Sequence, residues 1–424
     1  MTSSSGFTHA FANLLKTMIG SGLLTLPWVT AQAGMGFSLV GLTTLAVLTQ
    51  AAIRLMVRCV VHERQLAGAV YVDLDRAPAT AAASEDHGSG SWQLVSTAAC
   101  GKIGWYITCT SLMTAQLGVV SSYLDFVGGT LVDFAGCTAM TSRVLLWFLV
   151  TAMCMLRVLK SVSLLSMAAL FVYAYIICLV VYFGAEAYPE RASTESLIWF
   201  DPSRIGAWFG PSLFAFEGMG TALSIYESMG AVDARPFFTV ISAAYAVAIL
   251  VYCGVAAIGY AAWGQGVESV VLHSFPSTPI GQSANLMLAV VLLLSCALQL
   301  TPVFQTIEGA LPQGWPSNLW PIFRGIIVAL CATASYLIPD MEAMVGLTGA
   351  LAFSSIGFIL PGLFFLRLRP PAVVSAESKF GSSGVSGAGT VALEAALAYI
   401  MVALGLVGGV WGVYTELSKC FGGE

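Results

Sequence analysis

The sequence predicts an all-α, polytopic membrane protein with about 11 transmembrane helices, and three observations support that prediction. Of the 424 residues, 58% are hydrophobic and only 9% are charged, whereas a soluble domain carries about a quarter charged residues. Apolar runs of the roughly 20 residues that a spanning helix needs recur along the whole chain. Two of these runs are interrupted by paired glycines at matching places, which is typical of membrane proteins built from two repeats.

Charges and clusters of Gly, Pro and Ser separate the apolar runs into individual spans. The predicted spans cover residues 9–33, 37–59, 103–127, 140–159, 161–184, 204–228, 237–263, 281–305, 318–338, 342–366 and 391–415. A Gly34-Met35-Gly36 turn separates the first two. Arg143 lies inside the fourth span and Arg324 near the start of the ninth, and we expect both side chains to extend toward the lipid headgroups.

The distribution of Lys and Arg predicts the orientation in the membrane. Twelve of these residues fall on the side of the N-terminus and four on the opposite side, with Lys16 set aside inside the first span. Because basic residues accumulate on the cytosolic side, the N-terminus is predicted to be cytosolic. Two loops on that side, 61–99 and 370–389, are predicted to be linkers because they are poor in apolar residues, although either of them could instead carry regulatory contacts.

Composition and spacing exclude several classes of function. The net charge is −5 and no dense cluster of Lys and Arg is present, which excludes a nucleic-acid partner. The ten cysteines include no C-x-x-C pair, and the four histidines form no H-E-x-x-H pattern, so we expect neither a metal nor another cofactor. No paired acids or nucleophile with a base occur at helical spacing, so we expect no enzyme. The remaining partners are the lipid bilayer and a small molecule.

Paired glycines interrupt the first and the sixth span. The first contains Ile19-Gly20-Ser21-Gly22-Leu23, and the sixth contains Phe216-Glu217-Gly218-Met219-Gly220. Glycine favours unwinding of a helix, and unwound backbone inside a bilayer is tolerated only where it lines a cavity or is buried in protein. The alternative is that these glycines only allow close packing of helices. Interruptions five spans apart predict two inverted repeats, 9–184 and 204–366, with a peripheral helix at 391–415.

Glu217 is the strongest single functional candidate in the sequence. An acid at the centre of a spanning helix costs about 2.5 to 3.5 kcal/mol, so its side chain should face the protein interior and have a partner. Burial penalises the charged form, which would let Glu217 hold a proton and release it when water enters. Alternatively, Glu217 caps the freed backbone amides after the break. Asp125 in the third span is predicted to lie at the outer end in solvated surroundings.

Several motifs resemble the amino acid/auxin permease family. Residues 13–27 read N-L-L-K-T-M-I-G-S-G-L-L-T-L-P, which is similar to the first-helix signature of that family. Residues 214–220 read F-A-F-E-G-M-G and are followed by E-S-M at 227–229, which resembles a pattern of the proton-coupled and vacuolar branches. Gln116-Leu117-Gly118 and Ala297-Leu298-Gln299 are similar to those branches too. The resemblance covers nearly the whole chain.

The resemblance implies a LeuT-like five-plus-five fold. It also implies a secondary active transporter that moves small neutral amino acids by alternating access and couples this movement to protons. It implies that substrate binds at the two interruptions and that a coupling ion binds nearby. The implied substrate-binding residues are Thr17, Met18, Ile19, Gly20, Ser21, Gly22, Leu23, Phe214, Phe216 and Gly218. The implied ion-coupling residues are Glu217, Asn13 and Ser295.

Departures from the family pattern leave alternatives open. Asn13 stands where some proton-coupled relatives have His, and Gln299 falls where sodium-coupled relatives tend to place Thr. A sodium-coupled transporter and a non-transporting amino acid sensor of the same fold are therefore the alternative functions. The expected location is the plasma membrane or a vacuolar or lysosomal membrane, and the sequence leaves the oligomeric state open.

Overall fold

The computed structural model of the protein consists of helices and the loops that connect them in the residues that it describes, which are 4–73, 90–155, 162–194, 196–216, 218–229, 234–310, 319–338, 341–371 and 385–421. The helices are α1 (Ser4–Met18), η1 (Ser21–Thr25), α2 (Leu26–Ala33), α3 (Met35–Asp73), α4 (Gly90–Ala135), α5 (Ala139–Met155), α6 (Val162–Thr194), η3 (Pro202–Arg204), α7 (Ile205–Ala215), α8 (Met219–Ser228), α9 (Arg235–Trp263), η4 (Gly264–Gly266), η5 (Val271–Ser274), α10 (Pro279–Ala310), α11 (Trp320–Leu337), α12 (Met341–Thr348), η7 (Gly349–Phe353), η8 (Ser355–Ile359), α13 (Leu360–Leu368) and α14 (Val385–Phe421).

The helices correspond to the predicted spans. In the described part of the chain, eight helical segments are long and apolar enough to cross a membrane, and α5 is a shorter apolar helix. The two remaining predicted spans, 9–33 and 204–228, are divided into α1, η1 and α2 and into α7 and α8. Backbone N–H and C=O groups in a bilayer must be paired within the protein, which explains why the apolar runs form helices. The predicted all-α, polytopic membrane architecture is confirmed.

Glycine and proline set several of the helix ends. Gly34, with φ 91°, separates α2 from α3 at the predicted turn, and a Cβ atom there would lie 2.6 Å from the backbone nitrogen of Phe200. Pro27 and Pro321 occupy the first turns of α2 and α11, where a missing N–H costs no helical hydrogen bond. Gly101, with φ 63° and ψ −154°, bends α4 between its first turns and its membrane-spanning part. Gly34 and Gly101 have positive φ angles, which glycine adopts readily, and Pro27 and Pro321 have the fixed φ angle of proline, which suits the first turn of a helix.

The predicted linkers are shorter than expected. α3 continues to Asp73 and α4 begins at Gly90, so helix covers both ends of the predicted 61–99 loop, and 74–89 lie outside the described residues. α14 begins at Val385, inside the predicted 370–389 loop. Polar residues can continue a helix beyond the bilayer, where water solvates their side chains.

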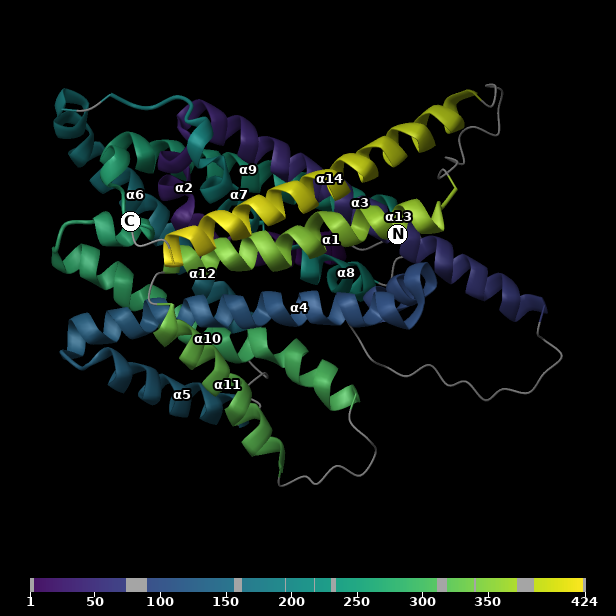
Figure 1. Ribbon diagram of the computed structural model, residues 1–424, viewed down its shortest axis with the longest axis horizontal. Helices are drawn as coiled ribbons and strands as arrows, with labels where there is room; N and C mark the ends of the chain where they lie inside the picture. Colours follow the sequence, from purple (N-terminus) through teal and green to yellow (C-terminus); the bar gives the residue numbers. More distant parts are fainter. Residues whose placement is uncertain are drawn as a thin grey trace.

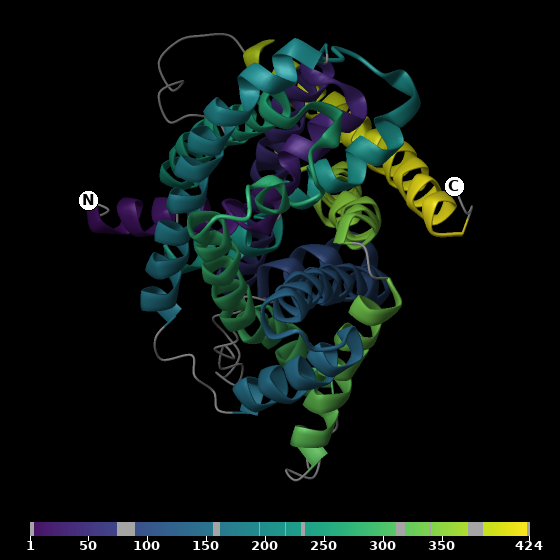
Figure 2. The same ribbon diagram turned by 90° about the vertical axis from the view of Figure 1, so that its left-hand side faces the viewer.

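The helices form two groups that we name here. The bundle helices are α1–α3 and α7–α9: α1, α2 and α3 each pack on α9, and α1 and α3 also pack on α8. The scaffold helices are α4, α5, α10 and α11, which pack on one another below the bundle helices in Figure 1. In Figure 2, turned by 90°, α4 is seen nearly end-on near the middle of the molecule. Equivalent spans of the two predicted repeats are in contact, α3 with α9, α4 with α10, and α5 with α11.

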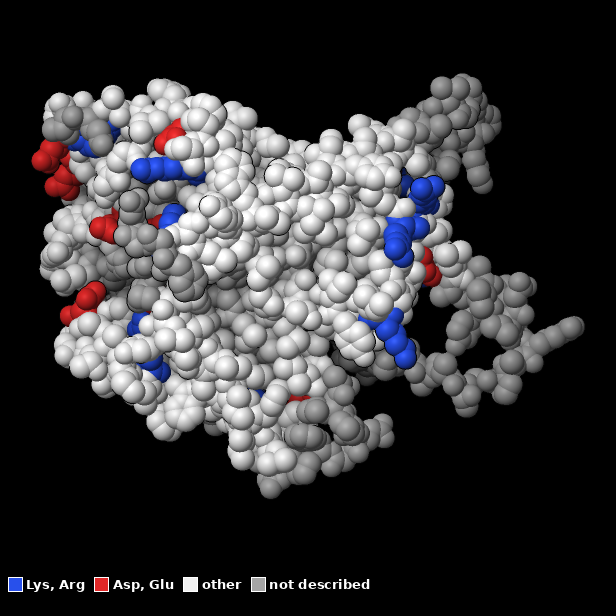
Figure 3. Space-filling view, in the orientation of Figure 1, with Lys and Arg blue, Asp and Glu red and all other residues white. Residues whose placement is uncertain are grey.

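Charged side chains gather at the two ends of the molecule, and a wide band between them is nearly free of charge on the face seen in Figure 3. The end that carries the N-terminus shows mainly Lys and Arg on this face, whereas the opposite end shows both signs. A band of uncharged side chains is what a lipid-facing surface requires, and an excess of basic residues is typical of a cytosolic end. We call the end with the N-terminus the inner end and the opposite end the outer end.

A buried ion pair joins α4 to α5. Nη2 of Arg143 lies 2.6 Å from Oδ1 of Asp125, and each side chain is 10% exposed. Gly128 makes room for the guanidinium group, because a Cβ atom there would collide with it. The predictions of a solvated Asp125 and a headgroup-directed Arg143 were therefore wrong. Each charge is neutralised by the other inside the helix packing.

Arg324 of α11 was also predicted to extend toward the headgroups, and this was wrong too. Its Nη2 lies 2.6 Å from Oε1 of Glu308 on α10, and its Nη1 donates a hydrogen bond of 3.0 Å to the backbone carbonyl of Cys154. The guanidinium group thus connects three scaffold helices. The charges, buried in the first case and partly buried in the second, pair with a neighbouring helix, as the cost of an isolated charge requires.

Candidate functional site

The first bundle helix is interrupted where the sequence predicts it. α1 ends at Met18, Gly20 is extended with φ −125° and ψ −162°, and the chain becomes helical again at Ser21. The N–H of Gly20 donates to the carbonyl of Met18 at 2.9 Å, and the N–H of Leu23 donates to the carbonyl of Gly20 at 3.2 Å. The regular α-helical hydrogen bonds are therefore missing at this point. The break leaves the last carbonyls of α1 and the first N–H groups of the following segment without helical partners.

The sixth span is interrupted in the same way. α7 ends at Ala215, Phe216 has φ −94° and ψ 36°, and α8 begins at Met219. The N–H of Phe216 donates to the carbonyl of Leu213 at 3.0 Å, which closes the last turn of α7 tightly. Glu217, the predicted proton-linked residue, falls between the two helices and lies outside the described residues.

The two interruptions are in direct contact. A Cβ atom on Gly22 would lie 2.6 Å from Cα and 3.0 Å from the backbone nitrogen of Ala215, so only glycine allows this approach. A Cβ atom on Gly218 would lie 3.0 Å from Cγ of Met18, which places the start of α8 beside the end of α1. Gly20 differs, since a Cβ atom there would meet nothing within 4 Å. The structure therefore brings the residues around Met18 and Gly22 together with Phe214, Ala215 and Gly218, with open space at Gly20.

A tyrosine from α9 joins the two interruptions. The buried hydroxyl of Tyr252 lies within hydrogen-bonding distance of the carbonyl of Met18 and 2.7 Å from the carbonyl of Ala215, and shares its one proton between them. These are the last residues of α1 and α7, whose carbonyls lose their helical partners at the breaks. The ring of Phe216 lies 5.2 Å from that of Tyr252. The single side chain of Tyr252 thus provides a hydrogen-bond donor to a freed carbonyl at each of the two breaks.

Sequence analysis missed Tyr252. It stands in the uninterrupted apolar run that became α9, with no glycine, proline or charge beside it. The available signal is weak: a buried tyrosine hydroxyl usually has a hydrogen-bond partner. Nothing in the sequence shows that the partners are carbonyls in two other helices.

Three buried polar atoms around the interruptions have no hydrogen-bond partner among the described residues. They are Oγ of Ser21, Oγ of Ser212 and the hydroxyl of Tyr245. Ser212 lies one turn before Phe216, and the ring of Tyr245 stacks on that of Phe216 with centroids 6.4 Å apart. Such groups cost about 1–3 kcal/mol each when they remain unpaired. Polar atoms left unpaired beside two broken helices are what a binding site for a polar ligand presents.

The contacts of the other predicted site residues say less about their role in binding. The hydroxyl of Thr17 donates to the carbonyl of Asn13 at 2.8 Å, and the side chain of Asn13 is exposed. The hydroxyl of Ser295 donates to the carbonyl of Val291 in its own helix at 2.8 Å. Phe214 packs edge-on against Phe353, with ring centroids 5.7 Å apart.

Packing covers the interruptions from the outer end. η5, in the loop between α9 and α10, packs on η1, and its residues Val271 and Leu272 are buried. Behind it, the backbones of α7 and the α12–η7 segment touch: a Cβ atom on Gly349 would overlap the carbonyl of Gly210. These contacts cover the outer side of the two interruptions.

A polar contact ties the bundle helices to the start of α4 at the inner end. The carboxylate of Glu227, at the end of α8, accepts a hydrogen bond from the hydroxyl of Ser91 and lies 3.3 Å from Nη2 of Arg64 on α3. Glu227 belongs to the E-S-M motif, whose role the sequence left unassigned. Its carboxylate joins α3 and α8 of the bundle helices to the start of α4.

Comparison with known proteins agrees with this architecture. Residues 3–415 match the family described as transmembrane amino acid transporter proteins. The chain belongs to this family. The chain is 24% identical over 428 residues to amino acid transporter AVT3B of Arabidopsis thaliana, with 96% of this chain and 92% of that protein covered. It is also 24% identical over 370 residues to vacuolar amino acid transporter 3 of Saccharomyces cerevisiae, with 84% of this chain and 50% of the yeast protein covered.

Solved structures share the fold. The structure of MhsT in complex with L-phenylalanine matches with a TM-score of 0.59 at 16% identity, covering 96% of this chain and 98% of MhsT. A manganese transporter from Eremococcus coleocola matches with a TM-score of 0.51 at 12% identity, covering 97% of this chain and 92% of that one. The predicted family, the LeuT-like fold and the multi-pass membrane location are thereby confirmed. The chain is an amino acid transporter and not an enzyme.

The hydroxyl of Tyr252 should contribute to stability. Replacing Tyr252 with phenylalanine leaves the buried carbonyl of Ala215 without this donor and the carbonyl of Met18 with only the N–H of Gly20, and we expect the free energy of unfolding to fall by about 1–3 kcal/mol. Thermal unfolding of the purified protein in detergent measures the change. Tyr182→Phe is the matched control, because Tyr182 on α6 is 59% exposed. Equal unfolding temperatures for the two variants would contradict the bridging role.

Proposed function

We propose that this chain is a secondary active transporter that binds small neutral amino acids between its two interrupted helices and couples their movement to protons through Glu217. The observation that supports this proposal is the contact of the two breaks at Gly22 and Ala215, with Tyr252 holding the freed carbonyls and Ser21 left unpaired. A zwitterion needs N–H donors and carbonyl acceptors side by side, and paired breaks offer both.

In this proposal the substrate carboxylate binds the backbone N–H groups of Ser21, Gly22 and Leu23. These groups begin the segment that continues as α2, where the helix dipole favours an anion. The substrate ammonium group binds the carbonyls of Thr17 and Ile19, since the carbonyl of Met18 already accepts from Tyr252. No neighbouring side chain fills the space beside Gly20, so the substrate can occupy it.

The walls of the proposed site favour a small, uncharged side chain on the substrate. Met18, Phe214 and Phe216 are buried and apolar, and they approach from both breaks. The unpaired hydroxyls of Ser21, Ser212 and Tyr245 are neutral. A charged substrate side chain would lose its hydration there without an opposite charge from any of these residues.

Two features support the proton as coupling ion. Glu217 stands between the two half-helices of the sixth span, and an acid at this depth is costly unless it has a function. Of the neutral candidates, Asn13 is exposed and therefore offers less to a buried sodium ion. Protonation of Glu217 from one side and release on the other would couple the proton to the substrate.

Alternating access requires that the inner and outer ends open in turn. The outer end is closed by η5 on η1 and by the contact of Gly210 with Gly349. The inner end is held by Glu227 with Ser91 and Arg64. In the proposed cycle the bundle helices rock against the scaffold helices, so that one of these contacts is broken while the other is intact.

We further propose a vacuolar or similar internal membrane as the location. Two of the relatives in yeasts are named vacuolar amino acid transporters, and the matches extend over most of this chain. Fluorescence of a tagged chain in yeast cells, compared with a vacuolar and a plasma-membrane marker, tests this. Signal at the cell surface alone would contradict it.

Transport by reconstituted protein tests the function. Purified protein in liposomes with an imposed pH gradient should accumulate radiolabelled L-alanine, and Glu217→Gln should abolish that accumulation while exchange of internal for external L-alanine continues. Glu186→Gln is the matched control, because Glu186 is an exposed acid at the outer end of α6. Accumulation by Glu217→Gln at the wild-type level would disprove the coupling role. Accumulation driven only by a sodium gradient would favour the sodium alternative, and binding without flux would favour a sensor.

A further inference from the structure

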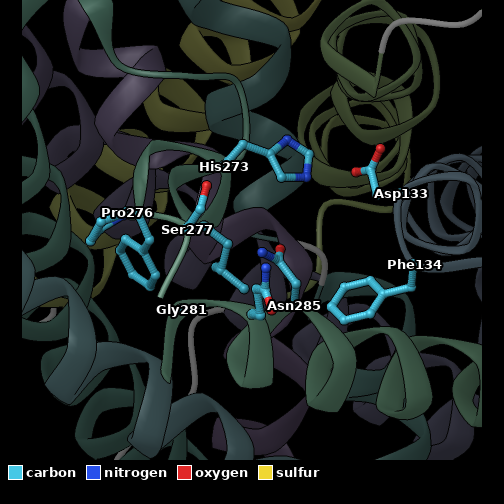
Figure 4. Close-up of a pocket in the computed structure, with 10 residues that line it drawn as sticks. Asp133, Phe134, His273, Pro276, Ser277, Gly281 and Asn285 are labelled. Carbon is cyan, nitrogen blue, oxygen red and sulfur yellow. The ribbon is translucent and has the colours of Figure 1, made fainter. Parts of the chain in front are cut away.

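A cavity of about 470 Å³ opens at the outer end of the molecule, and none of the predicted site residues lines it. Its walls come from three elements: the last turn of α4 with Asp133 and Phe134, the loop from η5 onward with residues 272–277, and the first turns of α10 with Gln282 and Asn285. Figure 4 shows the side chains of His273 and Asp133 at the upper edge of the cavity, with Asn285 and Phe134 below them. Its volume falls within the range of about 300–1,000 Å³ that is usual for small-molecule sites.

The polar groups of this cavity include acceptors that lack donors. Oδ1 of Asn285 is buried and has no hydrogen-bond partner among the described residues. Asp133 adds a carboxylate, which accepts hydrogen bonds only. An ammonium group carries three N–H donors and no acceptor, so its chemistry matches a carboxylate and an amide oxygen. No cluster of three His, Cys, Asp or Glu side chains that could hold a metal ion occurs in the described part of the chain, which disfavours a metal ion as the occupant.

The walls of the cavity also offer donors and apolar surface. The amide nitrogen of Gln282 and the hydroxyl of Ser277 can donate to a carboxylate, and Phe134 and Leu272 can cover an apolar side chain. The ring of His273 is held against Phe126, stacked with centroids 5.6 Å apart and planes 5° from parallel. Burial lowers the pKa of His273, against the opposing effect of the negative charges of Glu268 and Asp133. The imidazole is therefore neutral at neutral pH and adds no positive charge that would repel an ammonium group.

The cavity lies directly behind the loop that closes the transport site. Its residue Leu272 belongs to η5, which packs on η1 of the first break, whereas Asp133 and Asn285 belong to scaffold helices. A ligand held by Asp133 and Asn285 on one side and by residues 272–277 on the other would connect the loop to the scaffold. Whatever occupies the cavity therefore stabilises the closed outer end.

We propose that this cavity is a second amino acid site, which binds the α-ammonium group at Asp133 and Asn285 and, when occupied, holds η5 against η1. An amino acid in the outer compartment would thereby slow the opening of the outer end and reduce transport. This inference takes from the family only that the substrate is an amino acid, and it does not depend on proton coupling or on Glu217.

Hydrogen–deuterium exchange of the full-length protein in phosphatidylcholine nanodiscs tests the proposal. Millimolar L-alanine or L-leucine should slow amide exchange in the peptide that covers 271–282 by about threefold or more, because a ligand that binds the closed loop opposes its opening. Asp133→Asn should remove this protection but keep any protection at 18–25, the first break. Asp133 is exposed at the end of α4, so its replacement does not disturb the core. Glu186→Gln should behave as the wild type.

Three results would overturn the proposal. The first is no protection at 271–282 with either amino acid, whatever happens at 18–25. The second is protection at 271–282 that persists in Asp133→Asn, which would mean that it spreads from the first break. The third concerns the other common source of a primary ammonium group, a lipid headgroup: protection produced by phosphatidylethanolamine nanodiscs without any amino acid would assign the cavity to lipid. If the amino acid does not bind at the proposed transport site, residues 18–25 will show no protection from exchange, and this result is distinct from the three above.

Discussion

Replacing Gly22 with alanine is expected to reduce amino acid uptake by about tenfold or more, because overpacking by one carbon typically costs about 1–3 kcal/mol. The new Cβ atom would lie 2.6 Å from Cα of Ala215, and both atoms belong to the walls of the site. The collision is with backbone, so no rotation of a side chain relieves it. Relief requires η1 to move away from α7, which separates the two breaks.

The control for this prediction is Gly220→Ala in α8. Its Cβ atom would have Cδ2 of Leu112 as nearest neighbour at 3.7 Å, which is an ordinary contact, and alanine favours helix more than glycine does. Uptake of L-alanine into proteoliposomes, normalised to the amount of reconstituted protein, should stay within about twofold of wild type for Gly220→Ala. Ala215→Gly should not rescue Gly22→Ala, because the clash involves Cα and the backbone nitrogen. Wild-type uptake by Gly22→Ala would show that the breaks need not touch.

Asp125→Asn is expected to lower the free energy of unfolding by about 3–5 kcal/mol, because it leaves the guanidinium group of Arg143 buried without an opposite charge. The two side chains are only 10% exposed, so water cannot replace the lost partner. Thermal unfolding in detergent, together with the yield of monodisperse protein, measures the loss. Uptake per folded molecule should change little, since neither residue belongs to the breaks.

A double variant separates the loss of the pair from damage to the packing. Asp125→Leu with Arg143→Met removes both charges and keeps apolar volume, and it should be more stable than Asp125→Asn alone, since well-packed apolar residues often replace a buried ion pair without loss. Arg204→Gln is a control for removal of a basic residue, because Arg204 is largely exposed and lies 3.9 Å from Asp201. An unfolding temperature of Asp125→Asn equal to that of wild type would contradict the importance of this ion pair.

The arrangement of Tyr252 explains how two broken helices can exist in the membrane. Each break frees backbone carbonyls that lipid cannot satisfy. One hydroxyl reaches the carbonyls of Met18 and Ala215, and η1 fits against Ala215 because Gly22 lacks a side chain. The breaks therefore stabilise each other, and we expect them to move together with α9 when the bundle helices rock.

Local patterns in the sequence were sufficient for most of the fold. The helical turn at Gly34, the interruptions near Gly20 and Gly218, and the apolar runs between charged loops all follow from backbone preferences and hydropathy within a few residues. The ends of the cytosolic loops were less predictable. Helices such as α3 continue beyond their apolar part, and no local signal stops them before Asp73.

Charged residues were the least predictable from local patterns. Asp125 and Arg143 are 18 positions apart, and each alone is best explained by solvent or headgroups. Their pairing depends on the packing of α4 against α5 and on the space that Gly128 leaves. The same is true of Glu227, whose contact with Ser91 joins residues 136 positions apart.

The sequence by itself determined that this chain is an all-α membrane protein with two interrupted helices, because hydropathy, glycine and proline act on the neighbouring backbone. Only the tertiary structure decided which groups meet: Tyr252 with Met18, 234 positions away, Gly22 with Ala215, and the walls of the outer cavity. The physical reason is that a buried polar group takes its partner from whichever helix packs beside it, and that choice depends on the shapes of all the helices together.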